Sequence, residues 1–91
     1  MPRPVSVGQI SAKFDTEYKK KTKQRRNAID RALRLMATDL HYPSLRAQMM
    51  SGHRTIWEAH ATLGVVMTFD FIESDRIRLR VCCNHDIYRR P

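Results

Sequence analysis

Apolar residues in the first half of the chain recur with the spacing of an α-helix. Between residues 23 and 42 they stand three or four positions apart, with arginines on the other faces, at Ile29, Ala32, Leu33, Met36 and Leu40. Thr22 can cap the start of this helix through its hydroxyl oxygen. Pro43 disfavours helical backbone at the residue before it, so we expect the helix to end shortly before that proline.

Two shorter elements should precede this helix. Residues 5–10 follow a proline and are partly β-branched, which predicts a strand or an extended arm. Ser11 can cap another helix that begins near residue 12. Phe14 and Tyr18 lie four positions apart and would form the one apolar face of that helix.

After Pro43 the apolar positions repeat every second residue, which is typical of strands with one buried face. Short turns divide this half into four strands, at residues 45–50, 55–61, 65–72 and 76–83. Strands joined by such short turns predict an antiparallel meander. The order β-α-α-β-β-β-β predicts one α+β domain over residues 1–91, with an N-terminal strand and two helices on one face of the sheet.

The alternation also predicts which side chains face the helices. The buried face should hold apolar side chains from every strand: Leu45, Ala47, Met49, Trp57, Ala59, Ala61, Val65, Met67, Phe69, Phe71, Ile77, Leu79 and Val81. The opposite face should mix basic, acidic and imidazole side chains: Arg46, Gln48, Ile56, Glu58, His60, Val66, Thr68, Asp70, Arg78, Arg80 and Cys82. A slip of one residue would exchange the two faces.

The charge of the chain narrows the choice of partner. Seventeen lysines and arginines against nine acidic residues give a net charge of +8, spread over the body of the chain. Such a charge favours nucleic acid, an acidic protein or an anionic membrane surface. No apolar run approaches the ~20 residues of a membrane span. The first residues lack the apolar core of a signal peptide, so we expect a cytoplasmic protein.

Cys82 and Cys83 are adjacent in the last predicted strand. Neighbours on a strand point to opposite faces, so we expect two reduced thiols rather than a disulfide. A zinc site built from these thiols and His85 would need a second pair of ligands at zinc-site spacing, which the sequence does not offer. No cofactor is therefore expected.

The end of the chain holds the most unusual stretch. Arg76, Arg78 and Arg80 alternate with apolar residues, and the polar run 84–86 (Asn-His-Asp) follows at once. A histidine titrates near neutral pH, so His85 suits a general acid or base. The same side chain could instead be a polar group at a strand end, hydrogen-bonded to Asp86 or to solvent.

Several short segments, in order along the chain, match a pattern found in known proteins. They are residues 42–46 (Tyr-Pro-Ser-Leu-Arg), a glycine turn, residues 56–59 (Ile-Trp-Glu-Ala), residues 76–79 (Arg-Ile-Arg-Leu) and residues 84–86 (Asn-His-Asp). Upstream, residues 14–20 and 32–33 match two helices of that pattern. The ordered set resembles the RelE/ParE superfamily of toxins from bacterial type II toxin–antitoxin systems, over nearly the whole chain.

The resemblance implies one of two activities. RelE-like members are endoribonucleases (mRNA interferases) that enter the ribosomal A site, next to rRNA, and cut the mRNA there. ParE-like members inhibit DNA gyrase. The His85-Asp86 pair and the segment Glu58-Ala59-His60 are more similar to the nuclease branch, nearest its histidine-using, YafQ-type members. The resemblance thus implies a translation-inhibiting toxin that a cognate antitoxin protein neutralises.

One position departs from the nuclease pattern. Many nuclease members carry an arginine on the fourth strand, where this chain has Val66. Two alternatives therefore stay open. One is a ParE-like gyrase inhibitor, and the other is a catalytically degenerate member that still binds antitoxin or RNA.

RNA cleavage through attack by the 2′-hydroxyl needs a base, an acid and cations that stabilise the phosphorane, but no metal. The resemblance implies His85 as the acid and either His60 or Glu58 as the base, with Arg46 on the phosphate. Each residue has a structural alternative. His60 could simply pack on Ile56, and Glu58 could pair with an arginine of a neighbouring strand.

Further residues are candidates for RNA binding. Arg78 and Arg80 could hold RNA phosphate, dock an acidic antitoxin segment, or stand in solvent. Tyr88 could stack on a base near the cut or cover the edge of the core. A lysine cluster at the junction of the two helices could contact the rRNA backbone or form ordinary solvated surface; it includes Lys20, Lys21 and Lys23.

Overall fold

The computed structural model of the chain describes residues 2–84. Its elements follow the order β1 (Ser6–Ile10), α1 (Ala12–Lys19), α2 (Lys23–Thr38), the 3-10 turn η1 (Pro43–Leu45), β2 (Gln48–Met49), β3 (Trp57–Thr62), β4 (Val65–Phe71) and β5 (Arg76–Asn84). The sheet has the strand order β1-β5-β4-β3-β2. β1 runs parallel to β5, and the other neighbours are antiparallel. The predicted α+β fold is confirmed.

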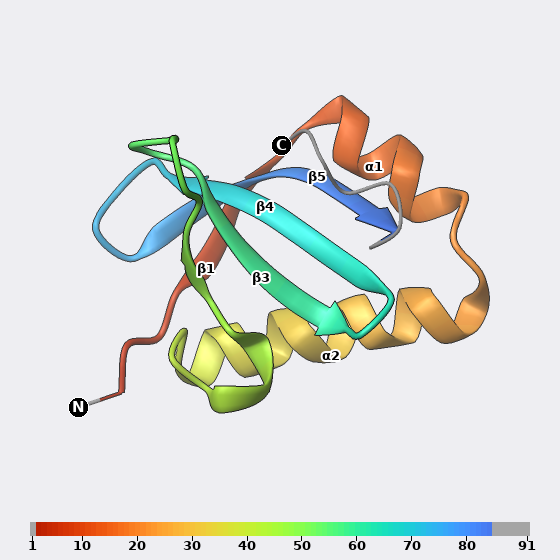
Figure 1. Ribbon diagram of the computed structural model, residues 1–91, viewed down its shortest axis with the longest axis horizontal. Helices are drawn as coiled ribbons and strands as arrows, with labels where there is room; N and C mark the ends of the chain where they lie inside the picture. Colours follow the sequence, from red (N-terminus) through yellow and green to blue (C-terminus); the bar gives the residue numbers. More distant parts are fainter. Residues whose placement is uncertain (1, 85–91) are drawn as a thin grey trace.

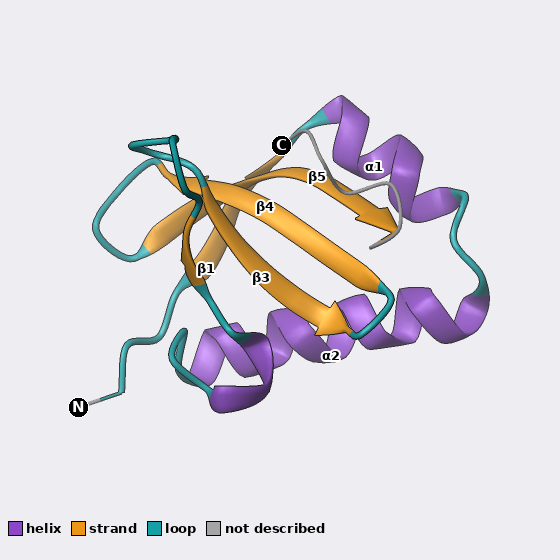
Figure 2. Cartoon of the chain, viewed as in Figure 1, coloured by secondary structure: helices purple, strands orange, loops and turns teal. Residues whose placement is uncertain are grey.

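Both helices begin where the sequence predicts. The hydroxyl of Ser11 accepts a hydrogen bond from Phe14 N, and that of Thr22 accepts one from Arg25 N. In Figure 1, α2 extends along one side of the sheet while α1 lies near the end of β5. Figure 2 separates the helices from the strands by colour. The core lies between the helices and the sheet, and Phe14 and the α2 residue Ile29 belong to it together with Met67.

Helix α2 ends at Thr38, earlier than Pro43 alone requires. Asp39 stops it by accepting hydrogen bonds from the backbone N–H groups of Arg3 and His41, both at 3.0 Å. These bonds hold the pKa of the Asp39 carboxyl below its ordinary value, with the Arg3 N–H as the larger cause. The N-terminal segment and the start of the loop to η1 are therefore fastened at one carboxylate.

The first strand of the meander is much shorter than predicted. Residues 43–45 form η1, and only residues 48–49 pair with β3. Leu45 is buried in the core as expected, but Met49 is half exposed. The cause lies at Arg46, whose φ of 48° is left-handed and turns the chain between η1 and β2.

A β-bulge in β5 overturns the predicted facing of two residues. Thr68 pairs with Val81 while Phe69 pairs with Leu79, so Arg80 is the extra residue. Past this point the alternation shifts by one position. Cys82, expected on the outer face, lies in the core, and Val81, expected in the core, pairs with Thr68 on the outer face.

Helix α1 and its cap hold this bulge. Ser11 donates its hydroxyl proton to Arg80 O at 2.6 Å, and its backbone N–H bonds to Leu79 O. Glu17 accepts a hydrogen bond from Cys82 N at 3.2 Å. Ser11 therefore caps α1 and fixes the bulge at the same time. Within residues 2–84, none of the helices combines the length and the apolar character that a membrane crossing requires.

Candidate functional site

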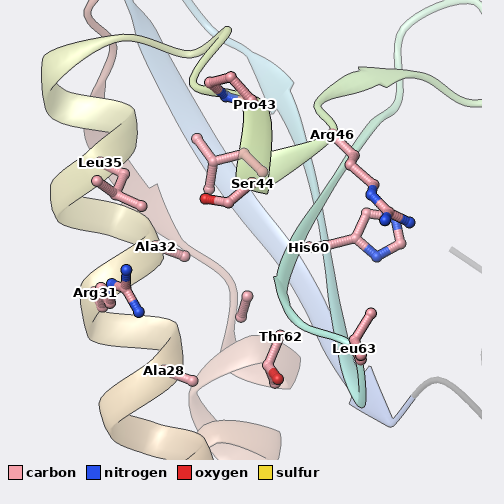
Figure 3. Close-up of a pocket in the computed structure, with 12 residues that line it drawn as sticks. Ala28, Arg31, Ala32, Leu35, Pro43, Ser44, Arg46, His60, Thr62 and Leu63 are labelled. Atoms are coloured by element: carbon pink, nitrogen blue, oxygen red, sulfur yellow. The ribbon is translucent and has the colours of Figure 1, made fainter.

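A cavity of about 580 Å³ lies between α2, η1 and the end of β3. Three segments contribute its lining: Ala28, Arg31, Ala32 and Leu35 from α2; Pro43, Ser44, Leu45 and Arg46 from η1 and its end; and His60, Ala61, Thr62 and Leu63 from β3 and its hairpin. Figure 3 shows the α2 side chains on one wall and Thr62 and Leu63 across from them.

Arg46 and His60 are both lining residues of this cavity. In Figure 3 both side chains point away from α2. The left-handed backbone at Arg46 is costly for a residue with a Cβ, by about 1–2 kcal/mol relative to glycine. Arg46 forms no hydrogen bond through its side chain with other described residues. A guanidinium with no hydrogen-bond partner among residues 2–84 leaves its N–H groups available to an anion.

Glu58 lies two residues before His60 on the same face of β3. Gln48 donates its amide N–H to Glu58 Oε1 at 2.6 Å, across the β2–β3 pair. This carboxylate therefore has an amide partner on the neighbouring strand. Because β2 pairs only as far as Glu58, no strand of the described chain lies beside the outer edge of β3 beyond that point.

Val66 lies directly beside His60 in the sheet. It pairs with His60 on β3 and with Cys83 on β5, and it is fully buried. The position where many nuclease members carry an arginine thus holds an apolar side chain next to the candidate base. Any cation at this site must come from another element, and Arg46 supplies one from η1.

Arg78 forms an ion pair within the sheet. Its Nε and Nη2 donate to the two carboxylate oxygens of Asp70 at 3.1 and 2.6 Å, across the β4–β5 pair. The side chain of Asp70 is 13% exposed, and the bidentate pair raises the pKa of Arg78. Because its charge already has a close counterion, Arg78 is a weaker phosphate ligand than sequence alone suggests.

Arg80 stands at the bulge, and its Nε is buried without a hydrogen-bond partner among residues 2–84. A bulge commonly redirects a side chain near a functional site. The junction of α1 and α2 carries Lys20 and Lys23 at exposed positions and Lys21 half-buried, with Lys21 O accepting a hydrogen bond from Arg26. None of these lysines lines the cavity.

The two cysteines are free and buried. Burial raises the pKa of Cys82 to about 12, and burial also raises the pKa of Cys83. Cys82 Sγ lies 3.7 Å from the Phe14 carbonyl oxygen, to which it donates. Thiols held protonated in this way are poor nucleophiles and poor metal ligands at neutral pH.

Two of the predicted site residues, His85 and Tyr88, lie outside the described residues. Sequence reasoning missed several residues of the cavity wall, among them Arg31, Ser44 and Leu63. Arg31 could have been found from the helical spacing that it shares with Ala28, Ala32 and Leu35. The part played by η1 had no comparable signal, because a short turn leaves no periodic pattern.

The fold is that of the RelE-like toxins. YafQ from Escherichia coli strain BL21(DE3) superimposes with a TM-score of 0.70 at 14% identity, over 90% of this chain and 94% of that one. The YoeB dimer structure from Staphylococcus aureus gives 0.65 at 12% identity, over 89% and 97%. A copper-bound mutant toxin from Helicobacter pylori gives 0.63 at 13% identity, over 93% and 99%.

Comparison of the sequence alone finds no relative. No protein-family model matches the chain, and no curated protein matches it at a significant level. At such low identity the structural likeness shows the shared fold, and the residues of the site carry the argument about function.

Proposed function

We propose that this protein is the toxin of a type II toxin–antitoxin system and acts as a ribosome-dependent mRNA endoribonuclease in the cytoplasm. The RelE-like fold supports the toxin class. The observation that carries the nuclease proposal is that Arg46, which follows η1, and His60 of β3 line one cavity. An imidazole and an arginine that forms no ion pair among residues 2–84 provide a proton carrier and a phosphate ligand at one cavity.

The proposed reaction assigns a role to each side chain. His60, or Glu58 on the same strand, takes the proton from the 2′-hydroxyl, whose oxygen attacks the adjacent phosphorus. Arg46 stabilises the charge of the phosphorane, and Arg80 is a second candidate for this role. As the bond from phosphorus to the 5′-oxygen breaks, His85 donates a proton to that oxygen. The products are a 2′,3′-cyclic phosphate and a 5′-hydroxyl end, and the chemistry requires no metal.

Further contacts would hold the ribosomal substrate. Arg78, Tyr88 and the lysine cluster (Lys20, Lys21 and Lys23) stay candidates for RNA binding. The lysines would supply a sequence-independent attraction to rRNA phosphate that weakens with salt. A cognate antitoxin would be the protein partner in the cell.

The test is cleavage of a translated mRNA on purified ribosomes, with the ends of the products mapped by primer extension. Wild-type protein should cut within the A-site codon and leave a 5′-hydroxyl end. His60→Gln and His85→Gln should each slow cleavage by about 10²-fold or more, the range of general acid–base catalysis. Intact mRNA with the wild-type protein, or full activity in both variants, would refute the nuclease assignment.

Buried Val66 favours a second candidate, a gyrase inhibitor of the ParE kind, because a site of that kind would need no catalytic arginine on β4. Purified protein should then block supercoiling by DNA gyrase while mRNA on the ribosome stays intact. A protein that does neither, yet still binds its antitoxin or RNA, would be the catalytically degenerate alternative.

A further inference from the structure

The shortest strand of the sheet carries a contact to one of the two candidate bases. β2 consists of two residues, and it pairs with β3 through Gln48 opposite Glu58 and Met49 opposite Trp57. Trp57 in turn stacks on Phe69 of β4, with 6.2 Å between the ring centroids. The aromatic contact holds β3 at this level, and the strand pairing fixes which β2 side chain faces Glu58.

The side chain of Gln48 is bonded to the carboxylate of Glu58. Its amide Nε2 donates to Glu58 Oε1 at 2.6 Å, which is short for a bond from nitrogen to oxygen. The two residues are direct cross-strand partners, so their side chains leave the sheet next to each other. With Oε1 fixed by this bond, the plane of the carboxylate and the direction of Oε2 are set as well.

The cross-strand neighbour of Glu58 on the other side makes no such bond. Thr68 of β4 stands opposite Glu58, and its hydroxyl is buried without a hydrogen-bond partner among residues 2–84. The bond from Gln48 also brings no positive charge to the carboxylate, because an amide is neutral. The Arg78 guanidinium, by contrast, neutralises Asp70 as it orients it. The Gln48 contact thus orients a carboxylate without neutralising it, as a general base requires.

The same strand register relates the two residues to the cavity. Gln48 opposite Glu58 defines an antiparallel register, in which each step back along β2 is a step forward along β3. Continued for two residues, this register sets position 46 opposite position 60, and both Arg46 and His60 line the cavity of about 580 Å³. One segment of three residues, 46–48, therefore supplies a cation at the cavity and an amide at Glu58.

We propose that Gln48 is a positioning residue, whose amide holds Glu58 in the orientation in which this carboxylate takes the proton from the 2′-hydroxyl. The inference rests on the proposed nuclease function and decides between its two candidate bases. The proton passes to Glu58 as the 2′-oxygen forms its bond to phosphorus. The 5′-oxygen receives a proton from His85 as its own bond to phosphorus breaks. His60 then stays with Arg46 at the cavity, on the phosphate.

The bond between Gln48 and Glu58 has a purely structural alternative, in which it only closes the edge of the sheet. Gln48 is exposed and Glu58 is half-buried, so water competes for both groups. A hydrogen bond in such a place adds little to stability, because water replaces it when it breaks. Loss of the amide should therefore hardly change unfolding, whereas a base that loses its orientation should transfer protons more slowly.

The test is single-turnover cleavage of a translated mRNA on purified ribosomes, with the full chain in excess over a range of concentrations. Gln48→Met removes the amide at nearly unchanged side-chain size. It should lower the maximal cleavage rate by about 10-fold or more, while the concentration that gives half of this rate stays within about twofold. Gln9→Met is the matched control, because Gln9 is an exposed glutamine of the other edge strand, β1. It should leave both constants within about twofold of wild type.

A double-mutant cycle separates positioning from a structural role. Glu58→Gln should slow cleavage by about 10²-fold or more, the range of general base catalysis. Adding Gln48→Met to Glu58→Gln should then cost no more than about twofold, since the carboxylate that Gln48 orients is already gone. Unfolding temperatures close to that of wild type would show that every variant is folded.

Four results would overturn the inference. The same loss from Gln48→Met in both backgrounds would mean that Gln48 acts through another group. A loss that appears only in the half-maximal concentration would make Gln48 an RNA-binding residue. Full activity in Glu58→Gln would assign the base to His60, and in these three cases the nuclease proposal stands. If the wild-type protein leaves mRNA intact on the ribosome, the nuclease proposal fails and the inference fails with it.

Discussion

The polar side chains Arg78 near β5 and Arg46 near η1 and β3 differ in whether they have a partner within the described residues. On the side of β5, Arg78 is held by both oxygens of Asp70, and Ser11 and Glu17 fix the bulge. On the side of η1 and β3, Arg46 lines a cavity beside His60 and has no counterion among residues 2–84. In the sequence, Arg46 and Arg78 each stand between two apolar residues. The two arginines therefore differ in their partners rather than in their position within the sequence pattern. Asp70 neutralises Arg78, whereas Arg46 is able to bind an anion.

The largest expected effect contrasts these two arginines directly. Arg46→Gln should slow mRNA cleavage by about 10²–10³-fold, because it removes the cation placed to meet the phosphorane. Arg78→Gln should slow cleavage by about fivefold or less, since Asp70 already neutralises that charge. Single-turnover cleavage on ribosomes measures both.

The loss of unfolding temperature should rank these two variants in the opposite order. Arg78→Gln leaves a largely buried Asp70 carboxylate unpaired and should lower the unfolding temperature, whereas Arg46→Gln should leave it nearly unchanged. Adding Asp70→Asn to Arg78→Gln should recover part of the loss. A larger loss of cleavage in Arg78→Gln than in Arg46→Gln would reverse the assignment of the two sides.

The next effect concerns the two helix caps. Ser11 accepts from Phe14 N and also donates to the bulge at Arg80 O, while Thr22 only caps α2. Ser11→Ala should therefore cost about 2 kcal/mol of unfolding free energy and Thr22→Ala about 1 kcal/mol. Urea unfolding followed by circular dichroism measures both. Equal losses would mean that the bulge does not depend on Ser11.

The residues that sequence predicts well are those governed by a local repeat or a local hydrogen bond. Ser11 and Thr22 mark their helices correctly because a cap involves only the next three residues. The alternation places β3 and β4 correctly for the same reason. The bulge at Arg80 escapes prediction because its supporting contact comes from Ser11, 69 positions away.

The candidate site shows the same limit. The alternation predicts that Glu58 and His60 share one face of β3, and the structure agrees, with each pairing to β4 in the regular register. It does not predict that Arg46, in a left-handed turn after η1, lines the same cavity as His60, because a single residue with positive φ leaves no periodic pattern. The roles of these residues stay predictions.

A smaller effect separates the role of the Arg46 guanidinium in cleavage from the strain of the Arg46 backbone. Arg46→Gly and Arg46→Ala both remove the guanidinium and should be equally inactive in cleavage. Only glycine relieves the left-handed backbone, so Arg46→Gly should be more stable than Arg46→Ala by about 1 kcal/mol. Chemical unfolding of the two variants tests this difference. Equal stability would show that the turn stores no strain.

The smallest effect concerns how the η1 wall is fastened. Hydrogen bonds from the Arg3 and His41 N–H groups lower the pKa of Asp39, so its ionised form stabilises the folded state. That contribution is complete above the ordinary carboxyl pKa of about 4 and is lost as the pH falls through the lower folded value. Asp39→Asn should therefore be less stable than wild type at neutral pH, and the gap should narrow under acid conditions. Urea unfolding across this pH range measures the gap. A gap independent of pH would show that the carboxylate charge plays no part in holding the N-terminal segment to the loop that leads to η1.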